Sequence, residues 1–178
     1  MFVVAILAQG CASITAVPIA TTQTQTAEQA KYFTLQGRIS VRVGDRLDAG
    51  KIQWSKLASE ERLQLFTPFG SQVAELVKTA NGPVTLRRDK ETLRAATIDE
   101  LTTSLLGVPL DMDAIAAWTQ GIGLNENEET GKKFANGDAW QVTAERFQSR
   151  GAHRFASRLS ATKGDTVVRL VVDEWRAE

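Results

Sequence analysis

The residues able to do nucleophilic or general-base chemistry are few in this sequence, and their spacing does not form a catalytic set. His153 is the single histidine, and Ser149 and Ser157 lie four residues before and after it, on an expected loop and strand. Hydrolysis by a triad needs a nucleophile beside a histidine that an acid orients. We interpret His153 as a half-exposed turn residue, and a hydrolase remains an alternative that its substitution would test.

Paired carboxylates occur at two places, and each place has a structural explanation. Asp111 and Asp113 stand at the start of an expected helix, where the helix dipole favours acidic side chains. Glu126, Glu128 and Glu129 lie in a polar loop. Neither group is accompanied by the partners that general acid–base catalysis requires. We therefore predict that the protein is not an enzyme and has no catalytic residues.

Nucleotide and metal motifs are also missing from the sequence. The Gly-Ile-Gly at residues 121–123 lacks the third glycine of a dinucleotide fingerprint and follows a helix where a strand is needed, and there is no P-loop. One cysteine and one histidine exclude an internal disulfide framework and a Cys/His metal cage. We predict neither a cofactor nor a metal ion.

The composition fits one globular domain. Of the 178 residues, 43% are hydrophobic and 24% are charged, which is ordinary for a folded chain with a core. Lysine and arginine total 21, and so do aspartate and glutamate. Because the charges balance and no strongly basic run is present, we do not expect nucleic acid as a partner.

The amino-terminal segment differs in kind from the rest of the chain. Glu28 is the first charged residue, and the apolar run FVVAILA at residues 2–8 is too short for a bilayer span of about 20 residues. That length is typical of the apolar region of a signal peptide. We expect residues 1–10 to be a signal-peptide remnant.

Cys11 ends this segment in a pattern that resembles a bacterial lipobox. Small residues Ala8 and Gly10 precede it, although Gln9 departs from the pattern and no lysine or arginine precedes the run. We favour acylation of Cys11 over a buried cysteine in an apolar strand. Residues 11–31 are rich in Thr, Gln and Ala without hydrophobic periodicity, which predicts a lipidated tether with a mean reach of about 25 Å.

From residue 32 the hydrophobic pattern has a period of two. Alternating segments at residues 33–43, 48–56, 62–67, 72–79 and 83–89 are separated by short turn sequences, which predicts hairpins in a meandering antiparallel sheet. Three further strands are expected at residues 139–147, 154–162 and 166–175.

Two amphipathic helices interrupt this pattern. Thr97 and Glu100 form a capping box before the first helix, which Gly107 ends. Asp111 is the expected N-cap of the second helix, which runs to Gly121. The predicted fold class is α+β, with one curved antiparallel sheet whose concave face the helices plug or cover, in a domain of residues 32–178.

The turn between two of the strands carries an unusual residue. Thr67-Pro68-Phe69-Gly70-Ser71 places a phenylalanine at the tip, where polar residues are normally found. The ring is either exposed or folded back over a sheet edge, and we favour exposure.

Taken in order, several segments of the chain resemble the outer-membrane lipoprotein receptor family LolB. They are LQGRISVRV, a strand ending in Trp54, LQLFTPFGS, LLGVPLDMDAIAAWTQG, AWQV and the final DEW. The resemblance covers residues 32–176. It implies an unclosed antiparallel β-barrel with a helical lid and an apolar cavity.

The resemblance also implies a function. Members of this family are lipid-anchored in the outer membrane and face the periplasm, where they accept acylated lipoproteins from the carrier LolA and insert them into outer-membrane lipid. We expect a monomer that works by affinity order without ATP. The alternative is a structural lipoprotein that braces an envelope assembly and has no acyl-chain cavity.

The same resemblance assigns roles to particular residues. The family's protruding loop has an apolar residue between proline and glycine, which here is Phe69 between Pro68 and Gly70, with Phe where Leu is familiar. The segment HRFASRL departs from the Leu-Pro expected before the penultimate strand. Candidates for lining the acyl-chain cavity are Ile39, Val41, Ile52, Trp54, Leu65, Leu76, Leu101, Leu105, Ile115 and Trp118.

Overall fold

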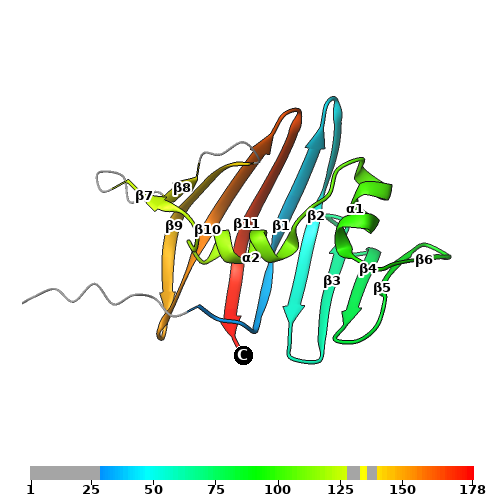
Figure 1. The fold of residues 1–178 in the computed structure, drawn as a ribbon, viewed down its shortest axis with the longest axis horizontal. Helices are drawn as coiled ribbons and strands as arrows, with labels where there is room; N and C mark the ends of the chain where they lie inside the picture. The colour runs from blue at the N-terminus through cyan, green and yellow to red at the C-terminus, as the bar shows by residue number, and fades with distance from the viewer. Residues whose placement is uncertain (1–28, 128–132, 136–139) are drawn as a thin grey trace, which may run out of the picture.

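The computed structural model describes residues 29–127, 133–135 and 140–178, which form one antiparallel sheet and two helices (Figure 1). The predicted signal-peptide remnant, Cys11 and all of the tether except its last three residues lie outside the described residues. The strands are β1 (Phe33–Val43), β2 (Arg46–Lys56), β3 (Glu60–Phe66), β4 (Gln72–Thr79), β5 (Val84–Arg88), β6 (Glu91–Ala95), β7 (Asn125–Glu126), β8 (Lys133–Ala135), β9 (Gln141–Arg150), β10 (His153–Lys163) and β11 (Thr166–Ala177). The helices are α1 (Ile98–Leu106) and α2 (Met112–Thr119).

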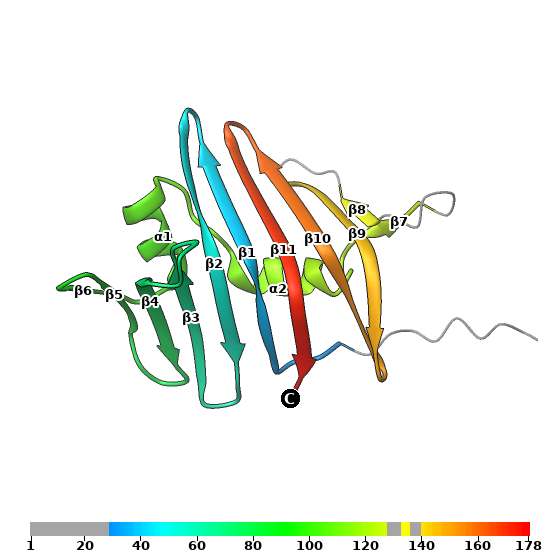
Figure 2. The ribbon, with the colours of Figure 1, turned by 180° about the vertical axis from the view of Figure 1, so that it is seen from behind.

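The strand order is β6-β5-β4-β3-β2-β1-β11-β10-β9-β8-β7, and each pair of neighbours is antiparallel. Within β1 to β6 and within β7 to β11, strands adjacent in sequence are neighbours in the sheet, and β11 pairs with β1 at the centre (Figure 2). The edge strands β6 and β7 do not meet, so the barrel is unclosed. This confirms the predicted sheet.

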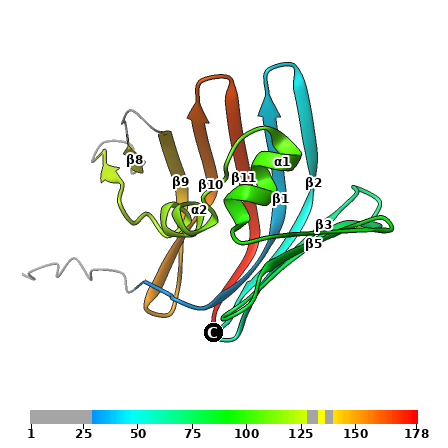
Figure 3. The same cartoon turned by 45° about the vertical axis from the view of Figure 1, so that its right-hand side comes forward.

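The sheet curves around both helices, which lie on its concave side (Figures 1 and 3). Helix α1 packs on β5 and β6, and α2 packs on β9 and β10. A β-bulge between Gln36 and Gly37 shifts the β1–β11 register, and bulges bend the strand that carries them. Gly37 is needed here, because a Cβ atom on it would lie 2.1 Å from the carbonyl oxygen of Val171.

The helix ends follow the capping signals of the sequence. The hydroxyl of Thr97 accepts a hydrogen bond from the backbone N–H of Glu100, whose carboxylate accepts one from the N–H of Ala96. Gly107 closes α1 with a φ of 80°, and the Asp111 carboxylate caps α2. Among the described residues, neither helix has the length and apolar character to cross a bilayer.

The alternating pattern of each long strand puts one face against the helices. In β1, for example, Phe33, Leu35 and Val41 are buried while Gln36 and Arg38 are exposed on the opposite face. The buried residues of the strands and of both helices form one apolar cluster on the concave side. We call the opposite, solvent-facing side the convex face.

Candidate functional site

The turn between β3 and β4 is closed by its own hydrogen bonds. Thr67 holds it with three hydrogen bonds: its N–H donates to the carbonyl oxygen of Ser71 (2.8 Å), its carbonyl oxygen accepts from Gly70 (3.0 Å), and its hydroxyl accepts from the N–H of Ser71 (3.2 Å). Gly70 has a φ of 93°, in the left-handed region that favours glycine. The loop conformation therefore does not depend on packing by the side chain at its tip.

Phe69 stands at this tip with 98% of its side chain exposed. The expectation of an exposed ring is confirmed, and the alternative in which the ring folds back over a sheet edge is wrong. Val73, at the start of β4, is 42% exposed, and Phe66 at the end of β3 is partly buried. A phenylalanine ring held at the tip of a turn and open to solvent can be buried in a membrane or against another protein without any change in the fold.

The predicted cavity residues converge on the concave side. Val41, Ile52, Trp54, Leu76, Leu101 and Ile115 are buried in the apolar cluster, and Ile39, Leu65 and Trp118 pack against it. The side chain of Leu105 lies outside what the structure describes. The structure thus brings nine of the ten candidates into one apolar layer between the sheet and its helices. In this state, side chains from the helices occupy that layer.

An aromatic cluster forms one end of this layer. The ring of Phe33 packs edge-on to Trp54 (centroids 5.0 Å apart) and stacks on Trp175 (6.2 Å), which stacks in turn on Phe155 (5.3 Å). Glu61 is buried, with 6% of its surface exposed. Its carboxylate accepts a hydrogen bond of 2.9 Å from the indole N–H of Trp54. Of these residues, only Trp54 is among the cavity candidates predicted from the sequence.

Helix α2 is tied to the rest of the fold at both ends. At its start, Lys56 of β2 donates to the Asp113 carboxylate, and this hydrogen bond holds the pKa of Asp113 below its usual value. At its end, the Gln120 side chain accepts from the N–H of Ala30 (2.7 Å) and donates to the carbonyl oxygen of the same residue (3.2 Å).

Helix α1 lacks comparable ties to the sheet. Its capping bonds are local, and the Thr102 hydroxyl accepts from the N–H of Leu110 in the following loop. Asp99 and Glu100 form no ion pair with any strand residue that the structure describes. Its attachment to β5 and β6 is therefore apolar, through Ile98 and Leu101.

The residues of the hydrolase alternative are not arranged as a triad. His153 and Ser157 are four residues apart on β10, which corresponds to about 13 Å along a strand. Ser149 on β9 is paired with Arg154, so its side chain lies on the opposite face of the sheet from that of His153. The Ser157 hydroxyl donates to the carbonyl oxygen of Arg146 at 2.9 Å. Strand β10 is continuous from His153 and pairs there with β9, but its pairing with β11 begins only at Arg158, so the unusual HRFASRL segment coincides with an edge that lacks its second neighbour.

An unclosed antiparallel barrel with two helices on its apolar concave side defines the half-barrel class of folds shared by LolA and LolB. Within that class, the chain belongs to the LolB family: the family model described as outer membrane lipoprotein LolB matches residues 31–175.

Individual relatives agree with this assignment. An outer-membrane lipoprotein LolB from Thiobacillus denitrificans is 27% identical over 178 residues, covering 94% of this chain and 91% of the relative. The LolB of Nitrosomonas europaea is 26% identical and covers 93% and 82% of the two chains, and that of Azoarcus sp. is 24% identical and covers 83% and 80%.

Proposed function

We propose that this protein is an outer-membrane-anchored receptor that accepts acylated lipoproteins from the periplasmic carrier LolA and inserts them into the outer membrane. Membership of the LolB family supports this proposal. The structural observation that carries it is the pairing of an apolar concave face with a fully exposed phenylalanine on a closed turn. One feature suits the shelter of acyl chains, and the other suits their release into lipid.

The anchor in this proposal is an acyl group on Cys11, joined to the folded domain by the tether, which is shorter than the predicted residues 11–31 because Ala30 is buried in the core. The domain begins beside α2, where Gln120 fixes Ala30. The protein then works as a monomer on a flexible tether. From there the domain can reach both the carrier and the periplasmic surface of the outer membrane.

Transfer in this mechanism is driven by differences in affinity. Each buried CH₂ of an acyl chain contributes about 0.8 kcal/mol, so chains do not leave for water at a useful rate. They move from the carrier to this receptor, and from the receptor to the bilayer, because each step buries them better. No reaction of the chain's own side chains is required, which accords with a protein that is not an enzyme.

Room for the chains has to be made by moving a helix, because helix side chains fill the concave side. We assign this movement to α1, since its attachment to β5 and β6 is apolar while α2 is tied at both ends. Acyl chains that replace Leu101 and Ile98 against the sheet restore the apolar contacts that α1 gives up. The exchange costs little free energy, because one hydrocarbon surface substitutes for another.

Phe69 acts at the release step. Its burial in lipid is worth about 1.5–3 kcal/mol, too little to anchor the protein but enough to bring the tip repeatedly into the interfacial layer, where aromatic rings are favoured. The alternative of a structural lipoprotein has no use for this tip or for an apolar layer that can open.

The decisive experiment follows cargo from loaded LolA through the receptor to liposomes. Phe69→Glu should accept cargo as the parent does and fail to deliver it, whereas Phe69→Leu should do both. Leu57→Glu is a matched control, because Leu57 is also exposed (43%) but lies in the turn between β2 and β3. If the parent protein takes no cargo from the carrier, the result supports the alternative of a structural lipoprotein. If Phe69→Glu delivers cargo as the parent does, Phe69 has no role in release.

A further inference from the structure

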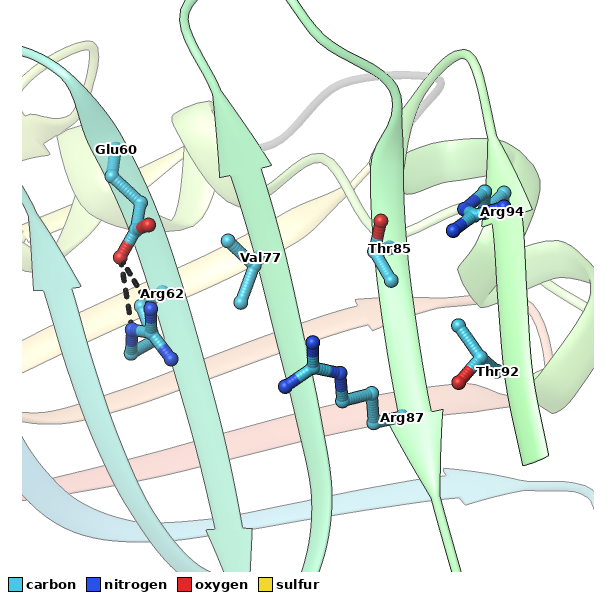
Figure 4. Close-up of a pocket in the computed structure, with 7 residues that line it drawn as sticks. All are labelled: Glu60, Arg62, Val77, Thr85, Arg87, Thr92 and Arg94. Atoms are coloured by element: carbon cyan, nitrogen blue, oxygen red, sulfur yellow. Dashed lines mark hydrogen bonds and ion pairs between the residues drawn. The ribbon is translucent and has the colours of Figure 1, made fainter. Parts of the chain in front are cut away.

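A polar hollow lies on the convex face, across strands β3 to β6, with a volume of about 460 Å³ (Figure 4). Three arginines line it, each from a different strand: Arg62 on β3, Arg87 on β5 and Arg94 on β6. Thr85 and Thr92 add two hydroxyls to its wall. This volume lies within the range of small-ligand sites, and the lining is rich in hydrogen-bond donors.

The three arginines differ in how closely each is paired with a carboxylate. Arg62 donates to both Glu60 and Glu75, and these hydrogen bonds raise its pKa. Arg87 is 69% exposed, and its nearest carboxylate oxygen, on Glu75, is 3.6 Å away. Arg94 is exposed and forms no ion pair with any residue in the described part of the chain. Three positive charges thus face two carboxylates: Arg94 has no carboxylate partner among the described residues, and Arg87, in an exposed ion pair with Glu75, keeps further N–H donors for an anion.

This hollow and the exposed tip belong to the same β3–β4 hairpin. Glu75 and Val77 share the convex face of β4, and Val73 is the extra residue of a β-bulge opposite the end of β3. Val77 lines the hollow, and Val73 lies beside the turn that carries Phe69. The distance from Val73 to Val77 is about 13 Å along the strand. One surface therefore carries apolar side chains at its tip and cationic side chains behind it.

We infer that this surface docks on the bilayer, with Phe69 and Val73 in the interfacial layer and Arg87 and Arg94 binding the phosphodiester of an anionic phospholipid in the hollow. The inference rests on the proposed function, because it takes the tip as the membrane contact. Guanidinium groups bind phosphate with paired hydrogen bonds, and cations near an anionic lipid surface are attracted to it. An acidic protein partner would pair with the arginines, but its acidic surface would not bury the apolar side chains at the tip.

The proposed docking fixes the orientation of the domain. With the convex face of β3 to β6 turned to the headgroups, the concave side and α1 face away from the lipid surface on the other side of the same strands. The site where cargo is held then stays accessible to a carrier in solution while the tip is engaged.

The test measures vesicle binding by flotation, using the full chain with Cys11→Ser so that no acyl anchor contributes. Neutral phosphatidylcholine vesicles are compared with vesicles that also contain phosphatidylglycerol. The double variant Arg87→Gln/Arg94→Gln should lose affinity for the anionic vesicles by about thirtyfold and keep the parent's affinity for the neutral ones. The matched control Arg158→Gln/Arg169→Gln removes two charges from the same face on β10 and β11 and should bind both vesicles like the parent.

Other outcomes separate the alternatives. Equal binding of parent and Arg87→Gln/Arg94→Gln to anionic vesicles would overturn the inference, as would complete competition by inorganic phosphate, which would identify a site for the free anion. Cargo uptake from LolA by the double variant should be unchanged. Loss of uptake with normal vesicle binding would make the hollow a carrier-docking site, which refutes the lipid inference and leaves the proposed function standing. Failure of the parent to take cargo refutes the proposed function alone.

Discussion

Gln120 and Ala30 form a two-way hydrogen-bonded pair across 90 residues of sequence: the glutamine side chain accepts from the alanine N–H and donates to its carbonyl oxygen. Both residues are buried. The pair joins the end of α2 to the first described residues of the chain, so the entry of the tether into the domain and the position of the helix are fixed together.

We expect Gln120→Ala to lower the free energy of unfolding by about 1–3 kcal/mol, because it leaves two buried backbone groups of Ala30 without their partners. Urea denaturation measures this loss. Gln53→Ala, which removes an exposed glutamine from β2, is the matched control and should have little effect. An equal effect of both substitutions would show that the pair is not a structural tie.

The ion pair between Lys56 and Asp113 predicts a dependence of stability on pH. Because the pair lowers the pKa of Asp113 from its usual 3.8, its contribution is present above that value and is lost as the pH falls through the folded-state pKa. The Asp113 side chain is 67% exposed, which limits the contribution to less than about 1 kcal/mol. Asp113→Asn should flatten the acid limb of a stability–pH curve, and an unchanged acid limb would contradict the ion pair.

Trp54 and Glu61 should be coupled in stability. Trp54→Phe removes the indole donor from a buried carboxylate and should cost about 2–4 kcal/mol. Adding Glu61→Leu removes the carboxylate as well and should recover about 1–2 kcal/mol of that loss. A double-mutant cycle by urea denaturation gives the coupling, and strictly additive effects would contradict it.

The two helices should differ in local stability. Hydrogen exchange of the unliganded protein should show the amides of α1 exchanging faster than those of α2, since only α2 has polar ties at both ends. A bound fatty acid should increase this difference, because it displaces α1 from the sheet. Similar protection of both helices, or an α2 that opens first, would contradict the assignment of α1 as the moving helix.

Gly37→Ala should destabilise the centre of the sheet. The added Cβ would lie 2.1 Å from the carbonyl oxygen of Val171, so β1 and β11 would have to separate locally. We expect a loss of about 1–3 kcal/mol in the free energy of unfolding, measured by thermal denaturation. Ser40→Ala on the same strand is the control, and a stability equal to the parent's in Gly37→Ala would show that the bulge can absorb a methyl group.

The long strands and both helices were predictable because each has a clear local sequence signal, either alternating hydrophobic residues or helix-capping residues. The alternation in β1, the capping box at Thr97 and the glycine at Gly107 place the elements to within a few residues. The short strands β6, β7 and β8 were not predicted. Strand β6 is exposed along most of its length, so burial imposes no alternation on it, and Asp89 forms its turn with a φ of 53° rather than with a glycine.

The candidate sites also divide into those that the sequence predicts and those that it does not. Phe69 was predictable as an exposed residue, because a single chain segment forms the turn around it. The hollow with Arg87 and Arg94 was not, because its lining comes from four strands whose registers the sequence does not specify. The aromatic cluster of Phe33, Phe155 and Trp175 was missed for the same reason, since its members lie far apart in the chain.

The pairing of β1 with β11 has a consequence for folding. The sheet is two meanders, β1 to β6 and β7 to β11, and the pairing of β11 with β1 is what joins them. Until these two strands, which lie far apart in the chain, have paired, the apolar sides of both meanders lack their central neighbours. Such long-range pairing makes folding slow, because the entropy of closing a long loop is lost before the contacts form.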